Sequence, residues 1–139
     1  AWSTLGLSTR WVVAGAVGAA LLVRRDPETL AWVIGSVANA TLSKVLKKLL
    51  NHTRPEGSDL QDPGMPSSHA MSLFFLGTYV IIALRHGSPA WCPLDPLATQ
   101  AAVAAYAVIA SAWRVRVGYH STAQIVVGAV AGTAFSCLW

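Results

Sequence analysis

The chain has 139 residues, of which 54% are hydrophobic and only 12% are charged, and its formal net charge is +4. A soluble domain of this size carries roughly twice that share of charged residues, so the composition argues against an ordinary water-soluble domain. The net charge does not indicate nucleic-acid binding, because no basic tract is longer than two residues and no basic face carries interleaved aromatic side chains.

Five apolar segments follow one another along the chain, and each is close to the ~20 residues that span ~30 Å of bilayer hydrocarbon. We therefore predict an all-α integral membrane helix bundle with about five transmembrane helices, forming a single domain over residues 1–139. The first segment could also be read as a signal sequence, but four further apolar segments favour a helix of the bundle. The segments are Leu5–Val23, Leu30–Leu50, Ser67–Leu84, Leu97–Trp113 and Thr122–Trp139.

Alternate crossing of the membrane divides the connecting loops between two sides. The loops Asn51–Pro66 and Arg114–His120 fall on one side and are the richest in polar, potentially reactive residues. The loops Arg24–Glu28 and Arg85–Pro96 fall on the other side. Basic residues outside the candidate site are too evenly divided for the positive-inside rule, so the orientation stays open.

Basic residues gather at the end of the second predicted helix. Arg54 follows Lys47 by seven residues, close to two helical turns, so both would project from one face if the helix continued that far. Lys44 and Lys48 fit an interfacial role, in which basic side chains at a helix end extend toward lipid headgroups. For Lys47 and Arg54 we favour anion binding, because other polar residues are predicted on the same side of the membrane.

The third predicted helix opens with Pro66-Ser67-Ser68-His69. Proline marks the boundary and serine is a preferred N-cap residue. A helix N-terminus also presents unpaired backbone N–H groups and a partial positive charge, so it can bind an anion. His69 lies in the first turn, beside that site. The alternative is an ordinary N-cap followed by an interfacial histidine.

The fifth predicted helix begins beside His120 and Gln124, an i, i+4 pair that shares one face. The Gln124 carbonyl could accept from one imidazole N–H, which would leave the other nitrogen free to attack. The alternative is an interfacial polar pair.

Together with Arg114 and the residues above, the pattern suits phosphoryl transfer. Cations neutralise phosphoryl oxygens, one histidine attacks and another protonates the leaving oxygen.

Three motifs, in order, carry a resemblance to a known family. K-x6-R-P is matched by Lys47, Arg54 and Pro55, P-S-G-H by Pro66-Ser67-Ser68-His69, and S-R-x5-H-x3-D by Arg114 and His120. From about Lys44 onward the chain resembles the type-2 phosphatidic acid phosphatase and vanadium haloperoxidase superfamily. Each motif alone is weak, but the ordered set is specific.

The resemblance implies a role for each matched residue. His120 would be the nucleophile that forms a phosphohistidine, which water then hydrolyses, and His69 would protonate the leaving group. No metal and no cofactor is required. Phosphate oxygens would be bound by Lys47, Arg54, Ser67, Ser68 and Arg114.

The chain departs from the family pattern at three positions, with Ser68 in place of glycine, Trp113 in place of serine and Gln124 in place of aspartate. A glutamine can hold a tautomer but cannot stabilise an imidazolium with a negative charge, so turnover should be slower. The stretch Asp62–Ala70 and Gln124 resemble the branch that holds plastid lipid phosphate phosphatases and dolichyl diphosphatases.

We therefore expect a metal-independent lipid phosphate phosphatase that acts on phosphatidic acid or related lipid phosphates in a plastid membrane or the endoplasmic reticulum. The alternatives are a polyprenyl (dolichyl-type) diphosphatase and a non-catalytic membrane protein that binds lipid phosphate. The oligomeric state stays open. Glu56, Asp59 and Asp62 are interpreted as a solvated acidic loop rather than a metal site, and His52 as a surface residue.

Overall fold

The structure is a computed structural model that describes residues 18–19, 22–58, 61–87 and 94–139. The first predicted segment, Leu5–Val23, lies largely outside these residues. The chain divides into two compact units, Ala1–Gly35 and Ser36–Trp139, and the candidate site belongs entirely to the second. The single-domain organisation of residues 1–139 stays a prediction.

The described part of the first unit ends in the start of helix α2 (Pro27–Leu50). The Asp26 carboxylate accepts from the Thr29 backbone N–H at 2.7 Å and from the Thr29 hydroxyl at 2.9 Å. Arg24 Nε donates to the same carboxylate at 3.0 Å. Proline suits the first helical position because its missing N–H would have no partner inside the helix. These local contacts explain why α2 begins before the predicted start at Leu30.

The second unit contains the rest of α2 and the helices α3 (Ser68–Arg85), α4 (Pro96–Arg116) and α5 (Thr122–Leu138). Each helix lies within about three residues of a predicted segment, as expected for runs bounded by clear caps. Ser67, Asp95 and Ser121 are the N-cap residues of α3, α4 and α5. No β-strand occurs in the ranges described above, and the all-α prediction is confirmed.

Helix length and composition support the membrane prediction. The helices α2, α3 and α4 are long and apolar enough to cross a bilayer, and α5 is a shorter apolar helix of 17 residues. Large apolar side chains such as Val37, Ile109 and Val130 are more than half exposed. An extended apolar exterior of this kind is typical of a lipid-facing surface. The integral membrane bundle is confirmed, with α2 to α5 accounting for the last four predicted segments.

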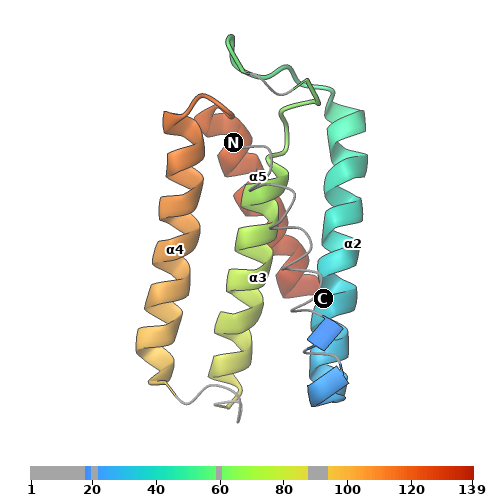
Figure 1. The fold of residues 1–139 in the computed structure, drawn as a ribbon, viewed down its shortest axis with the longest axis vertical. Helices are drawn as coiled ribbons and strands as arrows, with labels where there is room; N and C mark the ends of the chain where they lie inside the picture. The colour runs from blue at the N-terminus through green and yellow to red at the C-terminus, as the bar shows by residue number, and fades with distance from the viewer. Residues whose placement is uncertain (1–17, 20–21, 59–60, 88–93) are drawn as a thin grey trace. The chain divides into compact units, whose positions relative to one another are not determined.

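Helix α3 packs against both α4 and α5, and its contact with α5 is the more extensive one (Figure 1). A Cβ atom on Gly128 of α5 would lie 2.6 Å from the Ser67 carbonyl oxygen, and one on Gly132 would lie 3.1 Å from the Met71 Cα. The Gly128-x-x-x-Gly132 pair therefore lets the two backbones approach closely. Met71 and Phe75 of α3 are fully buried beside this contact.

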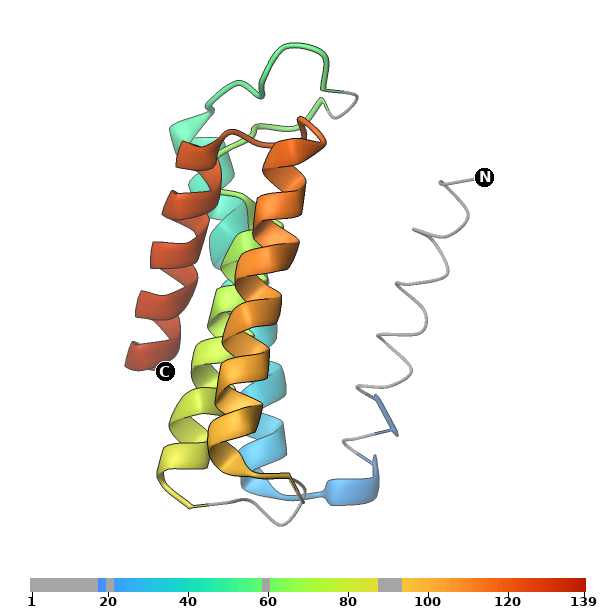
Figure 2. The same cartoon turned by 90° about the vertical axis from the view of Figure 1, so that its left-hand side faces the viewer.

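The chain direction of these helices brings their polar ends together. The loop that follows α2 and the connection between α4 and α5 lie at the same end of the second unit, where α3 begins (Figure 2). The predicted placement of the loops Asn51–Pro66 and Arg114–His120 on one side is therefore seen in the structure.

Candidate active site

Backbone and side-chain hydrogen bonds join the two polar loops directly. Arg54 Nη1 donates to the Tyr119 carbonyl at 2.8 Å, and Gln124 Nε2 donates to the Thr53 carbonyl at 2.7 Å. The Ser67 N–H donates to the Gln124 carbonyl at 3.1 Å and so ties the start of α3 to the start of α5. Residues more than sixty positions apart in the chain are thereby fixed against one another.

Gln124 is fully buried and orients the imidazole of His120, as the i, i+4 spacing predicts. The Ser121 N–H donates to Gln124 Oε1 at 3.1 Å, while Gln124 Nε2 faces the Thr53 carbonyl. Because an N–H can only donate and a carbonyl can only accept, these two contacts fix which end of the amide is oxygen. His120 Nδ1 lies 3.2 Å from this oxygen, so Nδ1 carries the proton and Nε2 keeps its lone pair.

His120 is 4% exposed and lies beside the guanidinium of Arg54. Arg54 Nη1 is 3.2 Å from Nε2 of the imidazole. Burial, followed by the positive charge of Arg54, lowers the pKa of His120 below its usual range, against the smaller opposing effect of the Gln124 hydrogen bond. The imidazole is therefore neutral at neutral pH and keeps a lone pair on one ring nitrogen.

Lys47 and Arg54 come together, although not in the way the sequence suggested. Helix α2 ends at Leu50, and Asn51 adopts a φ of 39°, so the two residues do not share a helix face. The loop instead folds back, and both cations pair with the carboxylate of Asp62. Arg54 Nη2 lies 2.7 Å from Asp62 Oδ1, and Lys47 Nζ pairs with Oδ2.

Asp62 is exposed, as expected for a solvated acidic loop, but its carboxylate also pairs with two cations, which the sequence did not indicate. Burial alone would raise the pKa of Asp62, but its hydrogen bonds to Lys47 and Arg54 and their charges outweigh burial and lower it. Arg54 Nε also donates to the backbone carbonyl of Asp62 at 2.8 Å. The pairing gives two mostly buried cations a counter-charge, which a buried charge requires.

The start of α3 carries the serines and the second histidine. The Ser67 hydroxyl accepts from the Ala70 N–H at 3.4 Å, and its side chain is fully buried. The Ser43 hydroxyl donates to the Ser68 hydroxyl at 2.7 Å, so the residue that replaces the motif glycine is held by α2. His69 is half-buried and lies within electrostatic reach of Arg114 and His120. His69, in the first turn of α3, therefore lies at the same end of the second unit as the connection between α4 and α5.

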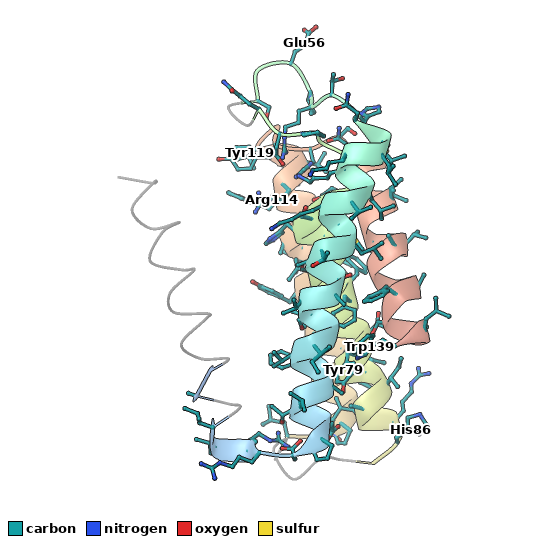
Figure 3. The ribbon with its side chains drawn as sticks, turned by 90° about the vertical axis from the view of Figure 1, so that its right-hand side faces the viewer. Glu56, Tyr79, His86, Arg114, Tyr119 and Trp139 are labelled. Atoms are coloured by element: carbon teal, nitrogen blue, oxygen red, sulfur yellow. The ribbon has the colours of Figure 1, made fainter. Side chains whose placement is uncertain are left out.

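Arg114 is supported by aromatic side chains. Its guanidinium carbon lies 5.6 Å from the centroid of the Tyr119 ring, a cation–π distance. Trp113 packs edge-on against the same ring, with centroids 6.2 Å apart. Figure 3 shows Arg114 and Tyr119 near each other at the loop end of the bundle. The tryptophan that replaces the motif serine thus supports the tyrosine whose carbonyl holds Arg54.

Two contacts with Gln124 were missed by the sequence reasoning. His52 is exposed, as predicted, yet its Nδ1 lies 3.2 Å from Gln124 Nε2. Gly64 packs on the amide, and a Cβ there would lie 2.8 Å from Gln124 Cδ. A glycine directly before Met65-Pro66 was a visible hint of such a close approach. Over the described ranges, no group of three or more His, Cys, Asp or Glu side chains could hold a metal ion.

Comparison with known proteins finds relatives in sequence and a solved structure with a similar fold. It is 38% identical to lipid phosphate phosphatase epsilon 2, chloroplastic, of Arabidopsis thaliana, over 94% of this chain and 45% of that protein. It is 27% identical to dolichyldiphosphatase 1 of Homo sapiens, over 97% of this chain and 60% of that protein. The chain spans about half the length of the curated relatives it matches.

Among solved structures, the crystal structure of a transmembrane PAP2 type phosphatidylglycerolphosphate phosphatase from Bacillus subtilis superposes with a TM-score of 0.77. The match covers 94% of this chain and 67% of the other, at 19% sequence identity, so it supports the fold. The family model of the PAP2 superfamily matches residues 28–139, which hold all three predicted motifs. The chain therefore belongs to the PAP2 superfamily, the family predicted from its ordered motifs.

Proposed function

We propose that this chain is a metal-independent lipid phosphate phosphatase that hydrolyses phosphatidic acid or a related lipid phosphate through a phosphohistidine on His120. The observation that carries the proposal is the pair of contacts made by His120: Nδ1 lies 3.2 Å from the Gln124 carbonyl oxygen, which leaves Nε2 unprotonated, and Arg54 Nη1 lies 3.2 Å from Nε2. Relatives at 36% and 38% identity that are named lipid phosphate phosphatases support the substrate class. Their chloroplastic designation supports a plastid membrane.

The substrate phosphate would bind between the cations and the start of α3. Lys47, Arg54 and Arg114 would neutralise its oxygens, because charge on the phosphoryl group must be balanced in the transition state. The Ser67 hydroxyl and the Ser68 N–H would add hydrogen bonds at the helix N-terminus. The anion would therefore be oriented with its phosphorus facing His120.

The reaction would proceed in two displacements. Nε2 of His120 attacks phosphorus, the bond from phosphorus to the lipid oxygen breaks, and His69 gives that oxygen a proton, which releases diacylglycerol. Water then attacks the phosphohistidine while His69 accepts its proton. The bond between phosphorus and nitrogen breaks, inorganic phosphate leaves, and both histidines return to their starting forms.

Gln124 would act as a positioning residue in both displacements. Its carbonyl holds the Nδ1–H of His120 throughout, but it supplies no negative charge as the imidazole becomes cationic. A polyprenyl diphosphatase remains the second candidate, because the relatives include proteins named dolichyldiphosphatase at 27–28% identity and the phosphate-binding residues would be the same.

The test is phosphate release by detergent-purified protein from phosphatidic acid and from a polyprenyl diphosphate, in EDTA, beside His120→Ala. Release that the substitution abolishes supports the histidine mechanism, and the faster lipid decides between the two substrate classes. Strict dependence on Mg²⁺ would contradict metal independence. A folded protein that binds phosphatidic acid but releases no phosphate would instead fit a non-catalytic binding protein.

A further inference from the structure

The carboxylate of Asp62 occupies the two cations that would bind phosphate. One carboxylate oxygen lies 2.7 Å from Arg54 Nη2, and the other pairs with Lys47 Nζ. A carboxylate placed in this way presents one anionic oxygen to each cation, as a phosphate group would. The site therefore holds an anion of its own before any lipid arrives.

We propose that Asp62 is an internal competitor for the phosphate site, displaced from Lys47 and Arg54 when the phosphate of a substrate binds. By this displacement Asp62 sets how tightly the site holds lipid phosphate and inorganic phosphate. The inference rests on the proposed function only in that Lys47 and Arg54 bind a phosphate group.

The burial of the three side chains indicates which of them would move. The Asp62 side chain is 54% exposed, whereas those of Lys47 and Arg54 are 12% and 7% exposed. A half-exposed carboxylate can turn into water at little cost, because water replaces its lost hydrogen bonds. The mostly buried cations cannot turn into water in the same way. Displacement therefore moves the carboxylate and leaves the cations in place.

Backbone contacts keep Arg54 in position after the carboxylate leaves. Arg54 Nε donates to the Asp62 backbone carbonyl at 2.8 Å, and Nη1 donates to the Tyr119 carbonyl at 2.8 Å. Neither contact involves the carboxylate of Asp62. Replacing the side chain at this position should therefore empty the cation pair without releasing the guanidinium.

The size of the change in phosphate affinity depends on the fraction of molecules in which the Asp62 carboxylate pairs with Lys47 and Arg54. When only a fraction of the molecules can bind a ligand, the apparent dissociation constant is the intrinsic value divided by that fraction. If the carboxylate holds the cations in roughly nine molecules of ten, its removal tightens phosphate binding about tenfold. A competitor raises both the dissociation constant for phosphate and the KM for lipid. Both constants should therefore fall when the Asp62 carboxylate is removed.

The experiment compares the full chain in detergent with Asp62→Asn, Asp62→Ala and Glu56→Gln. Glu56 is exposed on the same loop, and Figure 3 shows it at the outer end of that loop, so Glu56→Gln makes the same change in net charge away from the cations. Calorimetry measures the affinities for inorganic phosphate and orthovanadate, and a lipid assay measures the KM for phosphatidic acid.

We expect both Asp62 variants to bind phosphate and orthovanadate about tenfold more tightly, with a lower KM, and Glu56→Gln to stay within about twofold of the unchanged chain. Unchanged or weaker binding in the Asp62 variants would overturn the inference, as would an equal gain in Glu56→Gln or no phosphate binding by any variant. Because the anion titration requires no turnover, a chain that binds phosphate without hydrolysing lipid would contradict the proposed function alone.

Discussion

Restoring a carboxylate at position 124 should impair the site, although the family motif has an acid there. Gln124 Nε2 donates to the Thr53 carbonyl at 2.7 Å, and the residue is fully buried. In Gln124→Glu an ionised carboxylate oxygen would face that carbonyl oxygen with no proton between them. Losing the bond and leaving a buried carbonyl unsatisfied costs about 1–3 kcal/mol of folding free energy.

The Gln124→Glu variant also makes a prediction about pH. Burial and the Thr53 carbonyl both disfavour the charged form of the new carboxyl, so its pKa in the folded state should lie above that in the unfolded state. The folded variant would then be most stable at low pH, where the carboxyl is protonated and can donate to Thr53, and would lose stability as pH rises.

The assay is thermal unfolding in detergent at pH 5 and at pH 8, together with phosphate release from phosphatidic acid. Relative to the unchanged chain, the variant should be less stable and less active at pH 8, with most of the stability difference gone at pH 5. Higher stability and faster turnover at pH 8 would refute the reasoning, because the negative charge would then outweigh the lost hydrogen bond to Thr53.

Three further predictions concern His120 and its surroundings. Gly64→Ala would push a Cβ into the Gln124 amide and should lower kcat at least tenfold while the protein still folds, as tested by activity and helix content. Ser43→Ala removes the partner of the Ser68 hydroxyl, so KM should rise up to about tenfold; an unchanged KM would show that this bond does not position the start of α3. The pKa of His120 is lower in the folded chain than in the unfolded chain. Below about pH 6.5 the unfolded chain therefore binds a proton at this histidine more readily than the folded chain does, and thermal stability should fall as pH decreases from 7 toward 5. The fall should be smaller in His120→Gln.

The helices could be predicted from the sequence because their boundaries are local. Each apolar run of α3, α4 and α5 is preceded by a serine or aspartate N-cap, which marks where the helix begins. The pairing of His120 with Gln124 was equally accessible, since residues four apart on a helix are neighbours. Apolar run length and local capping therefore sufficed to predict helices α2 to α5, and the i, i+4 spacing sufficed for the orientation of one histidine.

The contacts made by the irregular loop could not be predicted in the same way. The course of the loop depends on tertiary contacts rather than on a repeating pattern, so the pairing of Asp62 with Lys47 and Arg54 had no periodic signal. The hydrogen bond from Arg54 to the Tyr119 carbonyl likewise joins positions that only the folded bundle brings together. Helix α2 ends at Leu50, as the predicted segment did, so the shared helix face that Lys47 and Arg54 would have had in a longer helix does not form.

The most direct test of the central claim is to trap the covalent intermediate. Detergent-purified protein is mixed with phosphatidic acid carrying radioactive phosphate, quenched in alkali within milliseconds, and digested to locate the label. A phosphohistidine on His120 predicts label that survives alkali, is lost in acid and is absent from His120→Ala. Steady turnover without any protein-bound label, or label that persists in His120→Ala, would contradict nucleophilic attack by this residue.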